Sequence, residues 1–239
     1  MRSREAYVKD MIRRRYARQA LDSSGAWGGR KRARQAGYSD SQLDGIPEAI
    51  VERWAGCGNV IANAPLDGAN LVVDLGAGSG LDALLANARS PHVIAIDLTP
   101  EMLNPLGATQ SGVQRIAGDI EMLPLADAVC DVVMANAAFN LALDPHEAFA
   151  EAWRILRPGG RLHICDLVRE GDLPPELLAD PLAWSTSLGG VMMERELVET
   201  IEGAGFSNIK VTGHRPFAPV VSVCIDAVRP QGGSISHDA

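Results

Sequence analysis

The sequence predicts an α/β fold of the doubly wound class, in which helices pack on both faces of a largely parallel sheet. Short apolar runs typical of buried strands occur at residues 71–75, 93–96, 132–134, 161–165 and 220–228. Helical patterns lie between them, notably at residues 81–88, 146–156 and 194–204. The first of these strands runs directly into a glycine-rich turn. This alternation indicates βαβ units.

The composition fits one α/β domain with additional segments. The chain has 239 residues, of which 46% are hydrophobic, so it can bury a large core. We expect a helical cap over residues 1–55, the main domain over residues 56–230 and a disordered polar tail over residues 231–239. No apolar run approaches membrane-spanning length and no signal-peptide pattern is present, so we expect a cytoplasmic protein.

Charge is distributed unevenly along the chain. Up to Arg34 there are 11 lysines and arginines against 3 acidic residues, whereas the remainder has 11 against 27. The basic stretch could bind nucleic acid, but Met11, Ile12 and Tyr16 are spaced for an amphipathic helix on an acidic body. We favour a solvated basic helix face and predict no nucleic-acid partner.

The four cysteines are widely scattered. Cys57 lies in a loop-like Gly-Cys-Gly context, and Cys130, Cys165 and Cys224 lie in apolar, strand-like surroundings. Their spacing suggests neither a disulfide framework nor a zinc site. We therefore expect buried, inert thiols in the strands and no metal site.

The glycine-rich turn is the strongest local signal for a ligand site. The run from Val73 to Gly80 places Asp74 in the strand and Gly76, Ala77, Gly78 and Gly80 in the turn. A dinucleotide-binding loop of the G-x-G-x-x-G type would need a glycine where Leu81 stands. The spacing therefore disfavours a dinucleotide, while the glycines still allow close approach of a ligand to the backbone.

Polar side chains follow the next three strands. Asp97 ends the second strand at about the distance at which nucleotide-binding folds place a ribose-binding acid, and Thr99 could cap the helix that follows. Asp119 and Ile120 follow the third strand, and Asn136 ends the fourth. Because the carboxyl ends of parallel strands share one edge of an open sheet, we expect these residues to meet there.

With these motifs in place, the chain resembles the class I methyltransferases, which use S-adenosylmethionine. The resemblance implies a seven-stranded Rossmann-like sheet, an N-terminal helical cap and an insertion after strand five. It implies that Asp119 takes the adenine amino group and Ile120 lines the ring. The cofactor-binding residues that we expect are Asp74, Gly76, Ala77, Gly78, Gly80, Asp97, Leu98, Met102, Asp119, Ile120 and Asn136.

Within that class the chain resembles the arsenite methyltransferase-like branch near the ubiquinone and menaquinone methyltransferases. Motifs that carry this likeness include Asp97 to Leu103 and Gly118 to Pro124. The family's arsenic site uses cysteine thiolates, of which Cys57 is kept, whereas Ala137 and Ser187 stand at the positions of two others. We therefore expect a pocket adapted to another acceptor, with an uncharged, cysteine-poor acceptor side.

The resemblance also supplies candidates for the acceptor side. We expect a substrate pocket formed by Tyr7, Tyr16, Cys57, Asn140, Trp184 and Ser187. No catalytic residue is assigned, because methyl transfer needs alignment and water exclusion more than a dedicated base. The candidates are Tyr16, Asn140 and His214, which stands in a late loop-strand region.

The function we predict is S-adenosylmethionine-dependent methylation of a small organic acceptor, with secondary metabolism as the expected setting, by a monomer or homodimer. One alternative is a metalloid methyltransferase that uses Cys57 with a borrowed thiol. A second is a donor-binding enzyme that does not methylate, such as a cyclase. A nucleic-acid methyltransferase is disfavoured by the acidic body.

Overall fold

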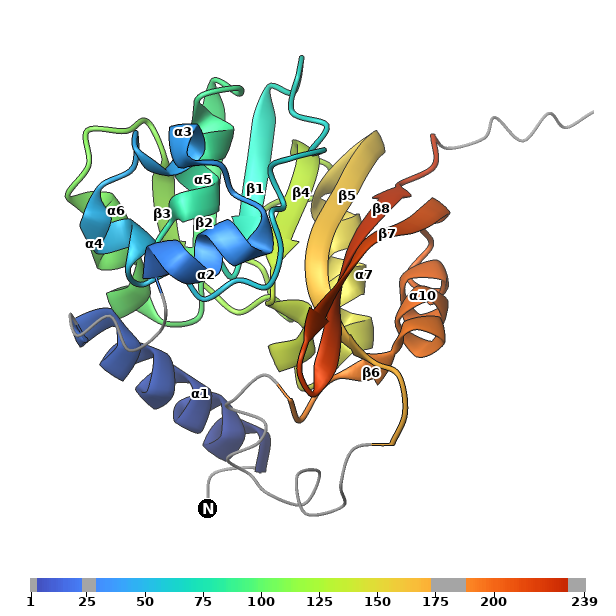
Figure 1. Cartoon of the computed structure of the whole chain (residues 1–239). Coiled ribbons are helices and arrows are strands. Elements are labelled where there is room, and N and C mark those ends of the chain that lie inside the picture. The colour runs from blue at the N-terminus through green and yellow to red at the C-terminus, as the bar shows by residue number, and fades with distance from the viewer. Residues whose placement is uncertain (1–3, 23–28, 173–187, 232–239) are drawn as a thin grey trace, which may run out of the picture.

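The computed structural model describes residues 4–22, 29–172 and 188–231. Seven strands form one sheet in the order β3-β2-β1-β4-β5-β8-β7, and a short β6 pairs with β5 (Figure 1). Strands β1 to β5 run parallel, and β8 is antiparallel to β5 and β7. The strands are β1 (Leu71–Leu75), β2 (His92–Asp97), β3 (Gln114–Ala117), β4 (Cys130–Asn136), β5 (Leu156–Arg169), β6 (Met192–Met193), β7 (Ser207–Phe217) and β8 (Val220–Val228).

Helices cover both faces of this sheet, as the sequence predicts. On one face α2 to α6 pack against Val72 and its neighbours, and on the other α7 and α10 pack against Val73 (Figure 1). The helices are α1 (Arg4–Leu21), α2 (Gly29–Ala36), α3 (Asp40–Leu43), α4 (Glu48–Val51), α5 (Leu81–Asn87), η1 (Pro100–Leu103), α6 (Asn104–Gly107), η2 (Phe139–Leu141), α7 (Pro145–Ile155) and α10 (Glu194–Gly203). This arrangement confirms the doubly wound α/β fold.

The alternation of side chains along β1 explains the two layers. Val72 belongs to the apolar cluster under the N-terminal helices, and Val73 belongs to the cluster under α7 and α10. The first cluster also contains Tyr38, Ile50 and Trp54 from the N-terminal segment. Because these side chains are buried with the sheet, the N-terminal helices α2 to α4 share its core.

Two cysteines correct the sequence prediction. Cys165 on β5 and Cys224 on β8 are opposite each other in antiparallel register and form a disulfide, with Cα atoms 4.1 Å apart. They are 59 residues apart in the sequence, so the pairing depends on the register of two distant strands. Cys57 and Cys130 are buried free thiols.

The remaining differences concern the end of the chain and the insertion. The late loop-strand region around His214 belongs to an 11-residue strand, β7, whose pairing with β8 shifts in register between Thr212 and Arg215. Most of the insertion after β5 and nearly all of the expected tail lie outside the described residues. Within the described ranges, no helix is long and apolar enough to cross a membrane.

Candidate functional site

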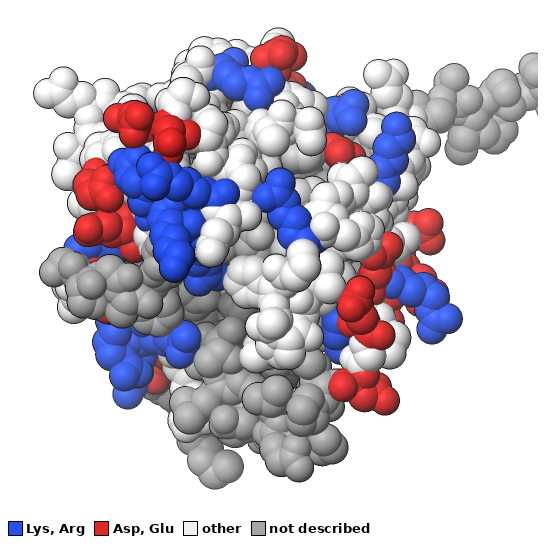
Figure 2. All heavy atoms as spheres, in the orientation of Figure 1, with Lys and Arg blue, Asp and Glu red and all other residues white. Residues whose placement is uncertain are grey.

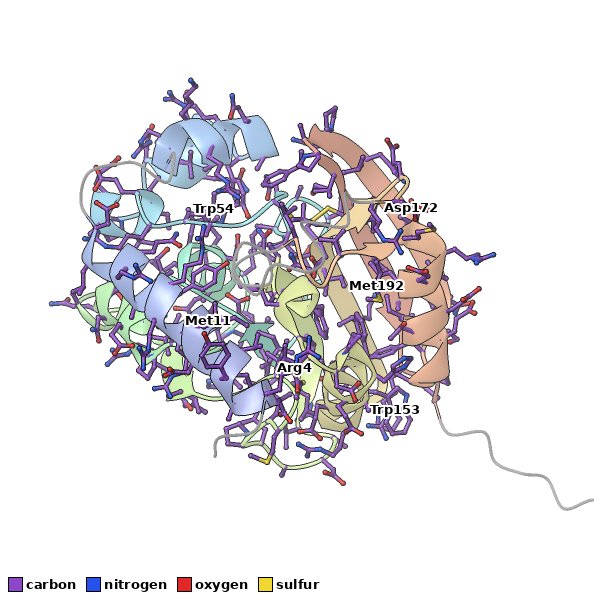
Figure 3. The ribbon with its side chains drawn as sticks, turned by 90° about the horizontal axis from the view of Figure 1, so that it is seen from below. Arg4, Met11, Trp54, Trp153, Asp172 and Met192 are labelled. Carbon is purple, nitrogen blue, oxygen red and sulfur yellow. A yellow bond between two sulfur atoms is a disulfide. The ribbon has the colours of Figure 1, made fainter. Side chains whose placement is uncertain are left out.

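A cavity of about 100 Å³ lies where the carboxyl ends of β1, β2 and β4 meet the N-terminal helices. Figure 3 views the molecule from below and shows α1, with Met11 on it, lying across this side, and Trp54 on the cap. The lining residues are Lys9, Ile12, Tyr16, Trp54, Ala55, Gly56, Asp74, Gly76, Ala77, Gly78, Ser79, Asp82, Asp97, Leu98, Thr99, Met102, Asp119, Ile120, Glu121, Asn136, Ala137, Ala138, Leu141 and Ala142.

The glycine turn forms the floor of this cavity. Gly76 and Gly78 have φ angles of 67° and 55°, a region that side chains other than glycine rarely adopt. A Cβ on Gly76 would lie 2.5 Å from the Cβ of Ala138. Gly76 therefore packs against Ala138 at a point where no side chain would fit, and its backbone forms part of the cavity lining.

Asp97, at the end of β2, is held by the same turn. Its Oδ2 accepts the N–H of Gly78 at 2.8 Å, and its Oδ1 accepts the N–H of Thr99 at 2.7 Å. Burial raises the pKa of Asp97 to about 6, although these two hydrogen bonds act in the opposite direction. Thr99 occupies the N-cap position of η1 with Pro100 after it, as the sequence predicted, but its side chain makes no cap hydrogen bond.

Asp74 and Asp82 place two more carboxyl groups beside the turn. Asp74 is 1% exposed, and its Oδ2 is buried with no hydrogen-bond partner. Burial and the nearby Asp82 and Asp97 raise the pKa of Asp74. A buried acceptor without a donor costs free energy, so this oxygen is suited to a cationic or hydrogen-bonding ligand group.

Asn136 connects the sheet to the cap. Its Oδ1 accepts the N–H of Cys57 at 2.8 Å and that of Gly58 at 3.3 Å, and its Nδ2 donates to the Gly58 carbonyl at 2.8 Å. Nδ2 also donates to Asp82 at 3.0 Å. Asp82 accepts a further bond from the Tyr38 hydroxyl. Although burial raises the pKa of Asp82 to about 6, these donors favour its ionised form.

Lys9 on α1 also lines the cavity. Its Nζ lies 2.8 Å from Asp119 Oδ2 and 2.8 Å from Glu121 Oε2. Burial alone would lower the pKa of Lys9, but the two acidic partners outweigh it and raise that pKa. Helix α1 is thereby attached to the loop that follows β3.

Most of the predicted donor-site residues meet in this cavity. All of them line it except Gly80, which has a φ of 90° and lies at the start of α5, where a Cβ would collide with Leu106. Gly80 is therefore placed for helix packing. On the acceptor side Tyr16 lines the cavity, and Ala137 does so in the position of a missing cysteine.

Other predicted acceptor residues lie away from the lining. Tyr7 is 55% exposed on α1. Cys57 and Asn140 are buried behind the wall, where the N–H of Asn140 donates to Asp166. His214 lies on β7, is 53% exposed and has its Nε2 2.7 Å from Glu194, so the structure does not bring it to the cavity. Trp184 and Ser187 lie outside the described residues.

The sequence analysis missed several residues of the lining, chiefly Lys9, Trp54, Asp82 and Glu121. One signal was available: Lys9, Ile12 and Tyr16 are spaced i, i+3, i+7 and so share one face of α1. Asp82 in the first turn of α5 resembles an ordinary helix-dipole residue, and nothing local distinguishes it.

The charge of the cavity suits a cationic ligand. Its lining holds the carboxyl groups of Asp74, Asp82, Asp97, Asp119 and Glu121, and among the described lining residues Lys9 is the cation. S-adenosylmethionine carries a sulfonium and an ammonium group together with ribose hydroxyls and an adenine amino group. Each of these is a cation or a hydrogen-bond donor, so the acid-lined cavity and its glycine floor fit this donor.

A glycine turn with an acid at successive strand ends, on a doubly wound sheet, defines the class I methyltransferase fold. Residues 73–164 match the family model described as a methyltransferase domain. An arsenite methyltransferase of Halobacterium salinarum is 31% identical over 229 residues, covering 85% of this chain and 58% of that protein. A demethylmenaquinone methyltransferase of Thermobifida fusca is 36% identical over 124 residues, covering 50% of this chain and 51% of that protein.

A solved structure agrees with these relatives. The crystal structure of an arsenic (III) S-adenosylmethionine methyltransferase from Chlamydomonas reinhardtii is similar, with a TM-score of 0.67 and 25% identity over 80% of this chain and 72% of that chain. This chain spans 51% to 58% of the two curated relatives above. The chain carries a methyltransferase domain at residues 73–164 and is similar to class I S-adenosylmethionine-dependent methyltransferases of the arsenite and menaquinone branch, as its motifs indicated.

Proposed function

We propose that this protein transfers the methyl group of S-adenosylmethionine to a small organic acceptor of secondary metabolism. The observation that carries the proposal is the acid-lined cavity, in which Asp97 is oriented by two backbone N–H groups and Asp74 keeps an unpartnered buried oxygen. When bound, the donor supplies an electrophilic methyl group on a sulfonium. The protein's task is then to align the two reactants and exclude water.

Named residues take separate parts in this task. We assign Asp97 to the ribose hydroxyls, Asp119 and Ile120 to the adenine, and Asp74 to the ammonium group. Met102 and Leu98 supply apolar wall beside them. Tyr16 on α1 and Trp54, which follows α4, form the side that an acceptor would contact and keep that side shielded from water.

The metalloid alternative is disfavoured because two of the four cysteines form a disulfide and the other two are buried thiols. Cys165 and Cys224 are joined in a disulfide, so neither offers a thiolate. Cys57 is buried, and this burial strongly raises the pKa of its thiol, which keeps it protonated. Arsenic ligation needs several thiolates converging on one point, and the described cysteines do not provide them.

The test is calorimetric titration with S-adenosylmethionine and S-adenosylhomocysteine. We expect micromolar affinity for the wild type and at least tenfold weaker binding by Asp97→Ala, because the ribose loses its acceptor. Asp67→Ala is the matched control, since Asp67 is an exposed acid paired with Arg89 away from the cavity. Absence of donor binding by the wild type would refute the proposal.

A second measurement addresses turnover. Protein incubated with radiolabelled S-adenosylmethionine and pooled small-molecule acceptors should release labelled product and S-adenosylhomocysteine in equal amounts. Donor binding without labelled product, combined with conversion of an acceptor, would instead identify a non-methylating enzyme such as a cyclase. A cytoplasmic location, a monomer or homodimer and the absence of a nucleic-acid partner stay predictions, the oligomeric state being accessible to light scattering.

A further inference from the structure

Arg32 on α2 is a partly buried cation for which the proposed donor site has no role. Its Nη2 donates to the carbonyl of Ala55 at 3.3 Å, and its guanidinium carbon lies 5.1 Å from the centre of the Phe217 ring. Its Nε is buried and has no hydrogen-bond partner. No carboxylate of the described residues forms an ion pair with this side chain.

The position of Arg32 connects it to the acceptor side of the cavity. Ala55, whose carbonyl it contacts, lines the cavity, and so do the adjacent Trp54 and Gly56. Tyr16, another lining residue, and Cys57 are close enough to interact electrostatically with the guanidinium. Arg32 itself is not among the lining residues; it lies directly behind the part of the lining that Ala55 forms.

The neighbouring arginines of α2 form ion pairs with acidic side chains at the surface. Arg30 pairs with Asp44 and Glu48, and Arg34 pairs with Asp40. Figure 2 shows basic side chains gathered on one face of the molecule with acidic side chains beside them. Arg32 differs because it is partly buried and has no such acidic partner within residues 4–22, 29–172 and 188–231. Burial lowers its pKa, which measures the cost of an uncompensated cation.

We propose that Arg32 binds a carboxylate group of the methyl acceptor and so selects acidic small molecules as substrates. The inference rests on the proposed function and names its substrate class. A planar guanidinium presents paired N–H groups that match a carboxylate, and one unpaired cation balances one negative charge. This role differs from the expectation of an uncharged acceptor side, and the experiment below decides between the two.

The physical reason for selectivity is desolvation. A neutral acceptor bound beside Arg32 would exclude water from the guanidinium without supplying a counter-charge. An acceptor with a carboxylate would supply that negative charge. A charge-assisted hydrogen bond to a partly buried group is expected to favour an acid over its amide by about tenfold to a hundredfold. Discrimination thus comes as much from rejecting neutral molecules as from attracting acids.

The experiment uses the full chain loaded with S-adenosylhomocysteine and a panel of aromatic and aliphatic carboxylic acids, each matched with its primary amide. Binding is measured by thermal shift and then by calorimetry. We compare the wild type with Arg32→Gln and Arg32→Lys, and with Arg34→Gln as the matched control on the same helix. If Arg32→Gln lacks a cooperative thermal transition, Arg32→Lys carries the comparison.

The expected result is that acids bind tenfold to a hundredfold more tightly than their amides to the wild type and to Arg34→Gln. Arg32→Gln should abolish this preference and Arg32→Lys should retain part of it, with unchanged S-adenosylhomocysteine affinity in all of them. Equal binding of acids and amides, including binding of neither, overturns the inference, as does a preference that survives in Arg32→Gln. Failure of the wild type to bind S-adenosylhomocysteine overturns the proposed function itself.

Discussion

The wall of the cavity that comes from the strand ends differs from the wall that comes from the N-terminal helices. Asp97 and Asn136 are the last residues of β2 and β4, and Asp119 lies two residues beyond β3. Tyr16 and Trp54, in contrast, reach the cavity only because the segment before β1 folds back over it. The first wall is set by local sequence and sheet topology, and the second by packing between distant segments.

This difference separates two kinds of specificity. A donor common to a whole family can be recognised by a wall that every member of the fold possesses, because parallel strand ends always meet at one edge. An acceptor is recognised by the wall that varies. The predictions below test whether the two walls depend on separate interactions, beginning with the largest expected effect.

Reduction of the Cys165–Cys224 disulfide should lower stability by about 4 kcal/mol, because a bridge that closes a loop of this length restricts the unfolded chain. Urea titration with and without a reductant measures the change. The double variant Cys165→Ala/Cys224→Ala should be insensitive to the reductant. Identical midpoints for the wild type under both conditions would contradict the disulfide, and alkylation of the unreduced, unfolded chain should modify two cysteines.

Asn136→Ala should lower the free energy of unfolding by about 3 kcal/mol, since it leaves the N–H groups of Cys57 and Gly58 and one carbonyl buried without partners. Asn87→Ala is the control, because its side chain donates one long bond of 3.3 Å to Ser90. Denaturant titration of both variants gives the comparison. A loss below about 1 kcal/mol for Asn136→Ala would show that the two walls are not joined through this amide.

Gly76→Ala should weaken S-adenosylhomocysteine binding about a hundredfold, because the added Cβ collides with Ala138 and the backbone is strained. Gly68→Ala separates these two causes, since Gly68 also has a positive φ of 81° but a Cβ there meets nothing within 4 Å. Calorimetry should find normal donor affinity for Gly68→Ala. Equal losses in both variants would assign the effect to general destabilisation.

Acidification should weaken S-adenosylhomocysteine binding about tenfold between pH 7.5 and pH 5. The pKa of Asp97 is raised to about 6, so its carboxylate becomes protonated as the pH falls through that value and accepts ribose hydroxyls less well. Calorimetry at three pH values tests this. Asp97→Asn should bind weakly with a flatter profile, and an unchanged slope in that variant would assign the dependence to another acid such as Asp82.

The sequence was sufficient for the features that depend on local order. The glycine turn, Asp97 and Asp119 could be assigned because each follows a recognisable apolar strand, and the fold follows from the alternation of those strands with helices. Gly80 is the predicted donor-site residue that does not line the cavity. Its positive φ is as local a feature as that of Gly76, and both glycines avoid a collision with a neighbouring side chain, Leu106 for Gly80 and Ala138 for Gly76. Whether Gly80 contacts the donor therefore stays a prediction.

The features that were missed depend on register and on long-range packing. The sequence does not show that residue 165 lies opposite residue 224, and so two apolar cysteines appeared inert. Nothing local shows that Lys9 reaches the loop after β3, or that Arg32 differs from Arg30 and Arg34 beside it. These distinctions appear only when burial and partners are known.

Helix α1 supplies two residues to the cavity lining: Lys9, which is bonded to Asp119, and Tyr16, which follows seven residues later. A rigid helix carries a displacement at one end to the other, so a donor that competes for Asp119 would also move the acceptor wall. The two ligands would then bind with a coupling free energy, which acts equally in both directions. An acid bound by the protein should therefore change S-adenosylhomocysteine affinity by the factor by which S-adenosylhomocysteine changes affinity for the acid. Lys9→Met should reduce that factor toward one, and a factor that stays unchanged would show that α1 does not transmit it.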